Sequence, residues 1–200
     1  MPVVSIDGNI GAGKSTVLNY LKNNYHYQID LEPIDDWLPF LQDMYKNSKD
    51  AFEFQIKVWF DRTFNVQYPL NKNILTERSG FFHWEVFSKA NFKIGKLNER
   101  QYTILKDLYE KRCFDSDIYI YIRTDPKKSF DRINTRNRNC ESDINIKYIE
   151  LLHNLHENAY QKLLDEEIIN NVHIIEMENK SVQDIAKEIH DIISKYGVFK

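Results

Sequence analysis

Cysteine, proline and glycine are scarce in this chain of 200 residues, which has two, five and six of them. Two cysteines cannot build a disulfide framework, so we expect Cys113 and Cys140 to be free thiols in a reducing, cytoplasmic compartment. No apolar run approaches the length of about 18 residues that a membrane-spanning helix needs. No repeat and no linker rich in proline or glycine divides the chain, so we predict a single domain over residues 1–200.

The chain also lacks a strong excess of positive or negative charge, because its net charge is −3 and its isoelectric point is about 6.1. This balance argues against a nucleic-acid coat or a binder of anionic membranes. The first residues, MPVVS, lack a basic segment followed by an apolar one, so we expect no secretory leader. Aromatic residues, in contrast, make up 14% of the chain. We expect some of them to line a flat pocket rather than the core.

A glycine-rich segment over residues 8–16, GNIGAGKST, follows the apolar run at residues 3–6. It matches the phosphate-binding loop G-x-x-x-x-G-K-[ST] between a strand and a helix. Backbone N–H groups can wrap an anion there, and the helix N-terminus adds partial positive charge. Lys14 suits terminal phosphates and Ser15 suits magnesium, so we expect a nucleoside triphosphate to bind. The predicted contacts are Gly8, Asn9, Ile10, Gly11, Ala12, Gly13, Lys14, Ser15 and Thr16.

Short apolar runs alternate with segments of helical periodicity along the chain. This alternation predicts an α/β protein with a phosphate-binding loop and three layers, in which helices flank a five-stranded parallel sheet. The predicted strands are 2–7, 27–31, 72–76, 117–123 and 172–176. The predicted helices are 14–24, 37–46, 50–66, 80–90, 98–113, 126–137, 145–170 and 181–195.

Ligands of such sheets bind at the carboxyl ends of the strands, so the residues that follow the second and third strands are candidates for chemistry. Glu32 follows the second strand and could accept a proton from an attacking hydroxyl. Glu77 and Arg78 follow the third strand. A carboxylate there suits magnesium, and an arginine can bind the phosphate or the attacking oxygen. A helix-end charge at Glu32 and an internal Glu77–Arg78 pair are the alternatives without a substrate role.

A third cluster is basic and predicts an arginine-rich lid over residues 133–145. Arg132 and Arg136 lie four residues apart and share a helix face, and Arg138 follows where that helix ends. Such a lid could neutralise the charge of a triphosphate and exclude water. Without a phosphate-binding loop elsewhere in the chain, the same cluster would be read as a solvated helix face.

Together these segments resemble the deoxynucleoside kinase family, which includes deoxycytidine, deoxyguanosine and mitochondrial thymidine kinases and an insect multisubstrate kinase. The resemblance covers residues 3–160, in family order and nearly family spacing. The motifs that carry it are residues 6–16, Glu32-Pro-x-x-x-Trp37, Phe54-Gln55, Glu77-Arg-Ser79, and Arg132-x-x-x-Arg-x-Arg-x-x-Glu141 followed by Tyr148.

The resemblance implies transfer of the γ-phosphate of ATP, with Mg²⁺, to the 5′-hydroxyl of a deoxyribonucleoside in nucleotide salvage. It implies catalytic roles for Glu32 as general base, for Arg78 and for Lys14, and a magnesium site at Ser15 and Glu77. It also implies a homodimer packed through residues 50–66 and 98–113. Triphosphate contacts in the lid would come from Arg132, Arg136 and Arg138. The implied substrate-binding residues are Ile10, Glu32, Trp37, Tyr45, Phe54, Gln55, Val58, Arg62, Arg78, His83, Phe87 and Glu141. Of these, the resemblance implies that Gln55 binds the base edge and that Phe54 and Phe87 stack on the base. It implies that Tyr45 and Glu141 bind the sugar.

One position departs from the family. Arg62 stands where deoxycytidine and deoxyguanosine kinases carry an arginine, but the position of its usual acidic partner holds His83. A buried arginine without a carboxylate is costly. We therefore expect a wetter site, compensation by Asp61 or Glu85, or an Arg62 that turns outward, whereas Asp30 is expected to be only a strand residue. Tolerance of more than one deoxynucleoside follows, with deoxycytidine and purines favoured over thymidine.

Two other functions share parts of this pattern. A nucleoside monophosphate kinase of the thymidylate kinase type has the same loop and sheet, but needs a basic residue where Glu32 stands. A nucleotide-binding switch needs a D-x-x-G segment after the third strand and an N-K-x-D segment, and the sequence contains neither. A scaffold without catalysis would have no use for Lys14, Glu32 and Arg78 together.

Overall fold

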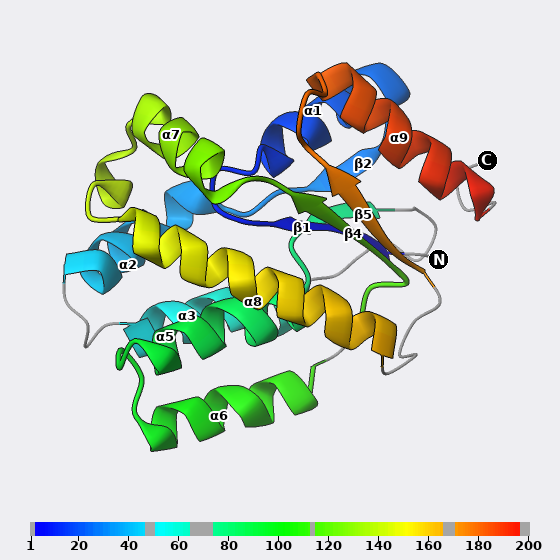
Figure 1. The fold of residues 1–200 in the computed structure, drawn as a ribbon. Coiled ribbons are helices and arrows are strands. Elements are labelled where there is room, and N and C mark those ends of the chain that lie inside the picture. The colour runs from blue at the N-terminus through cyan, green and yellow to red at the C-terminus, as the bar shows by residue number, and fades with distance from the viewer. Residues whose placement is uncertain (1–2, 47–50, 65–73, 113–114, 166–170, 197–200) are drawn as a thin grey trace.

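A central parallel sheet with helices on both faces organises the chain (Figure 1). The computed structural model describes residues 3–46, 51–64, 74–112, 115–165 and 171–196. Its strands lie side by side in the order β2-β3-β1-β4-β5. They are β1 (Val3–Gly8), β2 (Gln28–Asp30), β3 (Ile74–Glu77), β4 (Ile118–Arg123) and β5 (Val172–Glu176). The predicted five-stranded parallel sheet is therefore confirmed.

Two buried strands, β1 and β4, lie side by side within the sheet. β1 pairs with β3 at one edge and with β4 at the other, and its residues are buried from Val4 to Gly8. The side chains of β4 are buried from Ile118 to Ile122. Continuous apolar runs of this kind are typical of strands buried on both faces.

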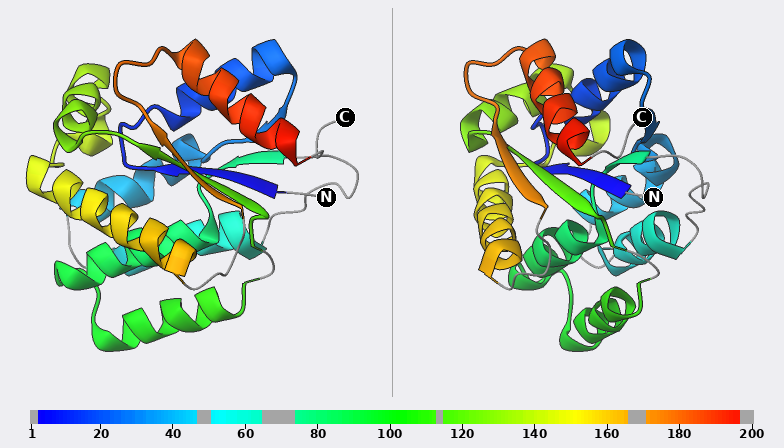
Figure 2. Two further views of the ribbon diagram at one scale, coloured as in Figure 1. Left: turned by 45° about the vertical axis from the view of Figure 1, so that its right-hand side comes forward. Right: turned by 90° about the vertical axis from the view of Figure 1, so that its right-hand side faces the viewer.

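One face of the sheet is covered by two helices from opposite ends of the chain (Figures 1 and 2). They are α1 (Lys14–Tyr25) and α9 (Val182–Lys195). Leu18 and Leu21 of α1 pack with Ile185 and Ile189 of α9 in one buried cluster with the sheet. Because α1 begins directly after the phosphate-binding loop, this packing fixes the direction of its N-terminus.

The opposite face carries a thicker layer (Figure 2). Its helices are α8 (Ile146–Asp165), α3 (Ala51–Trp59), and the continuous series α4 (Gly80–Phe82), η3 (His83–Ser88) and α5 (Lys89–Lys93). α6 (Glu99–Glu110) lies outside this layer, away from the sheet. At the carboxyl ends of the strands lie α2 (Ile34–Lys46), α7 (Pro126–Arg136) and the short turn η4 (Asn139–Glu141).

Two helices contain π-helical turns that the periodicity did not predict. α3 continues as η2 (Phe60–Phe64), and η3 lies inside the helix that follows β3. A π turn takes one residue more per turn than an α turn, so it rotates every side chain that follows it. Arg62 and His83, the unusual pair of the sequence, both lie in such turns.

The predicted helix starts are largely confirmed. Asp125 accepts a hydrogen bond from the Lys128 N–H, and Ser181 forms a capping box with Asp184. α2 begins at Ile34, three residues before its predicted start. Parts of the predicted strands and helices lie outside the described residues, namely residues 2, 50, 65–66, 72–73, 113 and 166–170. So does Cys113, whereas Cys140 is buried with a free thiol. None of the described helices has both the length and the apolar character that a bilayer crossing requires.

Candidate active site

The phosphate-binding loop connects β1 to α1 in a conformation that requires glycine. Gly11 has a φ of +77°, and a Cβ there would lie 2.4 Å from the Ser129 carbonyl oxygen. Gly13 has a φ of +90° and caps α1. A side chain at Gly11 would therefore push the loop away from α7 as well as strain its backbone.

Lys14 is buried beneath this loop. Its Nζ donates to the carbonyl oxygens of Gly8 and Asn9, at 3.2 and 3.0 Å, and lies 4.0 Å from Glu77 Oε1. Burial lowers the pKa of Lys14 to about 8, assisted by the charge of Arg78 and opposed by Glu77 and Glu32. An anion bound close to this ammonium would raise the pKa of Lys14 toward its usual value.

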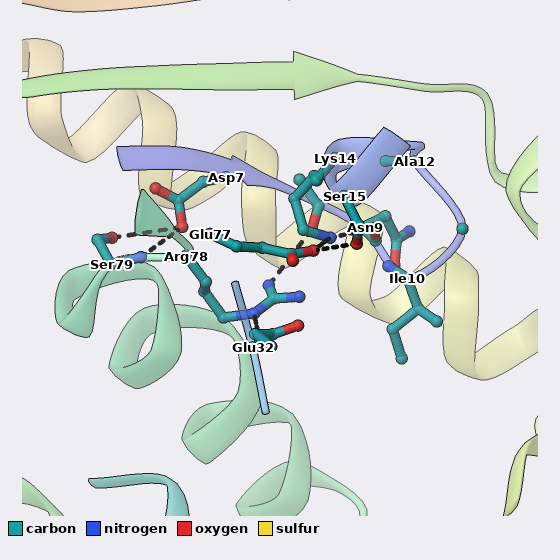
Figure 3. Close-up of polar contacts among 12 residues, drawn as sticks. Asp7, Asn9, Ile10, Ala12, Lys14, Ser15, Glu32, Glu77, Arg78 and Ser79 are labelled. Carbon is teal, nitrogen blue, oxygen red and sulfur yellow. Dashed lines mark hydrogen bonds and ion pairs between the residues drawn. The ribbon is translucent and has the colours of Figure 1, made fainter. Parts of the chain in front are cut away.

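Glu32 and Arg78 form an ion pair at the carboxyl ends of β2 and β3 (Figure 3). Arg78 Nε donates to Glu32 Oε1 at 2.7 Å, and both side chains are nearly buried. Arg78 has a φ of +71°, which is uncommon for a residue other than glycine. Strained backbone of this kind is found at functional sites, where the surrounding structure maintains it.

Glu32 is held in its proton-accepting form. Burial alone would raise its pKa, but the charges of Arg78 and Lys14 and the hydrogen bond from Arg78 lower it to about 2. The carboxylate is therefore ionised at neutral pH. In phosphoryl transfer, positioning and charge stabilisation contribute more than base strength, so a carboxylate of low pKa could still act as a base in such a reaction.

Asp7 maintains the turn that carries Arg78 (Figure 3). Its Oδ1 accepts from the Ser79 N–H at 2.9 Å and lies 3.4 Å from the Ser79 hydroxyl. Arg78 itself donates its backbone N–H to the Ile6 carbonyl oxygen at 3.1 Å. Burial raises the pKa of Asp7, against its hydrogen bonds and the charge of Arg78. This residue was not among the predicted site residues.

Ser15 and Glu77 are brought together as predicted. The Ser15 hydroxyl donates to Glu77 Oε1 at 2.8 Å. A hydroxyl and a carboxylate side by side beneath a phosphate-binding loop fit a magnesium ion, which takes few protein ligands and is held otherwise by phosphates and water. The described residues include no group of three or more histidine, cysteine or acidic side chains suited to a metal.

A cavity of about 270 Å³ extends from the ion pair of Glu32 and Arg78 to the aromatic side chains of α2, α3 and η3. All of the predicted substrate-binding residues line it except Arg62. The loop and lid contribute Ile10, Gly11, Gly13, Lys14, Ser15, Thr16, Arg136 and Arg138. Gly8, Asn9, Ala12 and Arg132 do not line it, although Arg132 Nη1 donates weakly to the carbonyl oxygens of Gly11 and Ala12, at 3.4 and 3.5 Å.

The walls of the cavity suit a flat base and a sugar. Trp37 and Phe54 meet edge to face, and the Arg78 guanidinium lies 4.1 Å from the centroid of the Phe87 ring. Glu141 is paired with Arg136 of the lid, with Nε to Oε2 at 2.9 Å. Tyr45 lines the same cavity as Glu141, which brings the two predicted sugar contacts together.

The end of the cavity lined by Gln55, His83 and Asn91, which we call the base end, contains neutral polar groups. Gln55 Oε1 accepts from the Ser88 hydroxyl at 2.9 Å, which orients its amide. Burial, together with repulsion by Arg78 and Arg62, lowers the pKa of His83 to about 3, so its imidazole is neutral. Among the described residues, His83 Nε2 and Asn91 Oδ1 are buried without a hydrogen-bond partner.

Arg62 has a partner that the sequence did not predict. Its Nη1 lies 2.8 Å from Asp30 Oδ2, and its side chain is only 10% exposed. It therefore neither turns outward nor pairs with Asp61 or Glu85. Asp61 binds Trp37 and Lys57 instead, and Glu85 binds Lys89 and Lys162. The expectation that Asp30 is only a strand residue was wrong, because its carboxylate is the acidic partner of the nearly buried Arg62.

Some lining residues were missed. Ile34, Leu41 and Met44 line the cavity on the same side of α2 as Trp37. Their spacing of three and four residues is a helical signal that could have identified them. Asn91 follows Phe87 by one helical turn, and the same spacing could have identified it too.

Comparison with known proteins decides among the functions that this geometry allows. The sequence model of the family described as deoxynucleoside kinase matches residues 4–199. This chain belongs to that family. As a deoxynucleoside kinase it is an ATP-dependent phosphotransferase whose acceptor is the 5′-hydroxyl of a deoxynucleoside, and it serves nucleotide salvage. Neither a monophosphate kinase nor a nucleotide-binding switch is favoured.

Similar proteins come from viruses and cells. A protein of fowlpox virus (strain NVSL), described as a probable deoxycytidine kinase, is 35% identical over 164 residues, which cover 77% of this chain and 69% of that protein. Deoxyadenosine kinase of Dictyostelium discoideum is 29% identical, over 82% of this chain and 66% of that protein. The structure of deoxyadenosine kinase from M. mycoides with bound dATP has a TM-score of 0.81 at 25% identity, and the match covers 96% of this chain and 99% of that one.

Proposed function

We propose that this kinase uses Glu32, Arg78 and Lys14 to move the γ-phosphate of ATP to the 5′-hydroxyl of a deoxynucleoside. The Glu32–Arg78 ion pair, with Lys14 close to the phosphate-binding loop, is the observation that supports this assignment most directly. An acceptor hydroxyl between Glu32 and the loop would have a carboxylate for its proton and a guanidinium beside the transferred phosphoryl group.

Ser15 and Glu77 would bind Mg²⁺, which when bound neutralises phosphate charge. Their hydroxyl and carboxylate oxygens lie 2.8 Å apart, directly after the loop and at the end of β3. The lid arginines Arg132, Arg136 and Arg138 would contact the triphosphate. Arg136 and Arg138 support this through their place in the lining of the cavity.

The acceptor would occupy the aromatic end of the cavity, with its base between Phe54 and Phe87 and its base edge at Gln55. Trp37, Val58 and Ile10 would enclose the base, and Tyr45 and Glu141 would bind the 3′-hydroxyl. Neutral Gln55 and His83 support a preference for more than one base, with deoxycytidine and purines favoured over thymidine. The relatives named for deoxycytidine and deoxyadenosine fit this preference.

A homodimer is also proposed, packed through α3–η2 and α6. Phe60 and Ile104, one on each of these segments, expose 56% and 45% of their surface. Light scattering of the purified protein would test the dimer. A cytoplasmic location stays a prediction.

Replacement of Glu32 by glutamine tests the proposal. Glutamine preserves the shape of the side chain and an acceptor for Arg78 Nε, but it cannot take up the proton. We expect ATP binding to be kept and kcat to fall by at least about a hundredfold, on the usual scale of general-base catalysis. Asp36→Asn, which changes an exposed acid four residues away, is the matched control. An unchanged kcat in Glu32→Gln would remove Glu32 from the role of base.

A further inference from the structure

Arg62 joins the carboxyl ends of β2 and β3, the two strands that lead to the catalytic pair. One terminal nitrogen, Nη1, lies 2.8 Å from Asp30 Oδ2 and 3.3 Å from the Leu31 carbonyl oxygen. The other, Nη2, donates to Thr76 Oγ1 at 2.6 Å and to the Glu77 carbonyl oxygen at 2.9 Å. A single guanidinium thus spans both strands, with two contacts on each.

These contacts begin where the pairing of the two strands ends. In the register of β2 and β3, Asp30 pairs with Thr76 as the last pair. Arg62 contacts the side chains of that pair and the carbonyl groups of the next residue on each strand. A planar guanidinium with several fixed donors is suited to such a bridge, and a lysine ammonium is not.

The residue that follows each of these two carbonyl groups is catalytic in the proposed mechanism. Leu31 precedes Glu32, and Glu77 precedes Arg78. The side chains of Glu32 and Arg78 meet at 2.7 Å, and Arg78 takes a left-handed φ of +71°. The hydrogen bonds from Arg62 to these carbonyl groups therefore fix the backbone immediately before Glu32 and Arg78.

The same contacts take Arg62 away from the base. Its terminal nitrogens are occupied by Asp30, Thr76 and the two carbonyl groups. In the described part of the chain, Arg62 is absent from the lining of the main cavity, which His83 and Gln55 do line. It lies instead in a much smaller pocket behind Glu32 and Arg78.

We propose that Arg62 and Asp30 are positioning residues of phosphoryl transfer, which fix Glu32 and Arg78 at the ends of β2 and β3, and that Arg62 does not recognise the base. This inference rests on the roles proposed above for Glu32 and Arg78. Asp30 balances the charge of a nearly buried guanidinium, and a buried arginine without its carboxylate would be costly. Removal of Asp30 leaves the other Arg62 contacts, so its effect is the smaller of the two.

The test compares kcat and KM for four deoxynucleosides in Arg62→Gln, Asp30→Ala and the double variant. We expect kcat to fall by about ten- to a hundredfold in Arg62→Gln, because small misplacements of catalytic groups have costs of this order. The fall should be the same for every base, KM should change much less than kcat, and the ratios of kcat/KM between bases should stay within about twofold. Asp30→Ala should show the same pattern more weakly, and the double variant should be no worse than Arg62→Gln.

Arg112→Gln is the matched control for the loss of an arginine–carboxylate pair. Arg112 Nε lies 2.5 Å from Asp115 Oδ1 near the end of α6, outside the cavity lining. This variant should lower the melting temperature and leave kcat unchanged. If Arg62→Gln behaves likewise, Arg62 is merely structural and the proposal is wrong.

Two further results separate the alternatives. A change of more than about tenfold in the preference among bases, with kcat preserved, would make Arg62 a base-binding residue and overturn the proposal. Glu32→Gln belongs in the same series, because a normal kcat there would refute the role of Glu32 rather than that of Arg62. Should Arg62→Gln fail to fold, Asp30→Ala and Arg62→Lys still test the proposal. Each of these two variants must lower kcat, and by the same factor for every base.

Discussion

We expect Lys14 to make the use of ATP sensitive to pH just above neutrality. Its side chain is 5% exposed, and its pKa is lowered to about 8, chiefly by burial and then by the charge of Arg78. The charged form is the one that attracts phosphates. As pH rises through this pKa, the free enzyme loses that charge, and capture of ATP should weaken.

The size of the effect follows from the pKa. With a pKa of about 8, roughly nine tenths of Lys14 is charged at pH 7 and roughly one tenth at pH 9. We therefore expect kcat/KM for ATP to fall by about tenfold per pH unit above pH 8, because this ratio reports groups of the free enzyme. Bound phosphates raise the pKa of Lys14 again, so kcat should stay level over the same range.

The assay is a series of initial rates between pH 6.5 and about 9.5, with a saturating deoxynucleoside and varied ATP. Glu77→Gln is an internal check, because Glu77 raises the pKa of Lys14. Its midpoint should move to lower pH even though its activity is low. A level kcat/KM up to pH 9.5, or a kcat that falls with the same midpoint, would refute the role given to Lys14 burial.

Two other predictions concern stability and substrate choice. The pKa of His83 is about 3 in the folded protein and about 6.5 unfolded, so the unfolded chain binds more protons between these values and stability is lost as pH falls. Between pH 6.5 and 5.5 this should cost about 1 kcal/mol, and urea unfolding of His83→Phe should show a smaller acid loss than the wild type. His156 acts with the same sign. In a panel of the four deoxynucleosides, we expect activity on deoxycytidine and purines above thymidine, and exclusive use of thymidine would contradict the proposed base end.

Most of the fold could be predicted because its signals are local. Apolar runs marked all five strands, and the cap at Asp125 with Pro126 marked the start of α7. The start of α2 was missed because the pattern of apolar residues becomes clear only at Trp37, whereas the helix already begins after Pro33. The π turns carry no periodic signal of their own, so the pattern of apolar residues does not reveal them.

The proximity of the candidate catalytic residues could be predicted for a different reason. Glu32, Glu77 and Arg78 each follow a strand directly, and the carboxyl ends of parallel strands meet at one edge. The topology therefore brings them together without any knowledge of side-chain conformations. Ser88, in contrast, comes from the middle of a helix, and only its hydrogen bond to Gln55 in the structure reveals its place beside the cavity.

The partner of Arg62 could not be predicted, because it depends on rotation rather than on order along the chain. Asp30 precedes Arg62 by 32 positions and lies on a strand, whereas Asp61 and Glu85 were the nearer candidates on helices. A helix that stayed regular through residue 62 would keep Arg62 on the side of Gln55, seven residues earlier. Arg62 lies instead within a π turn, which changes its rotation from that of a regular helix, and its guanidinium binds at the ends of β2 and β3. A histidine at position 83 is then tolerated, because Asp30 supplies the negative charge for Arg62 from β2.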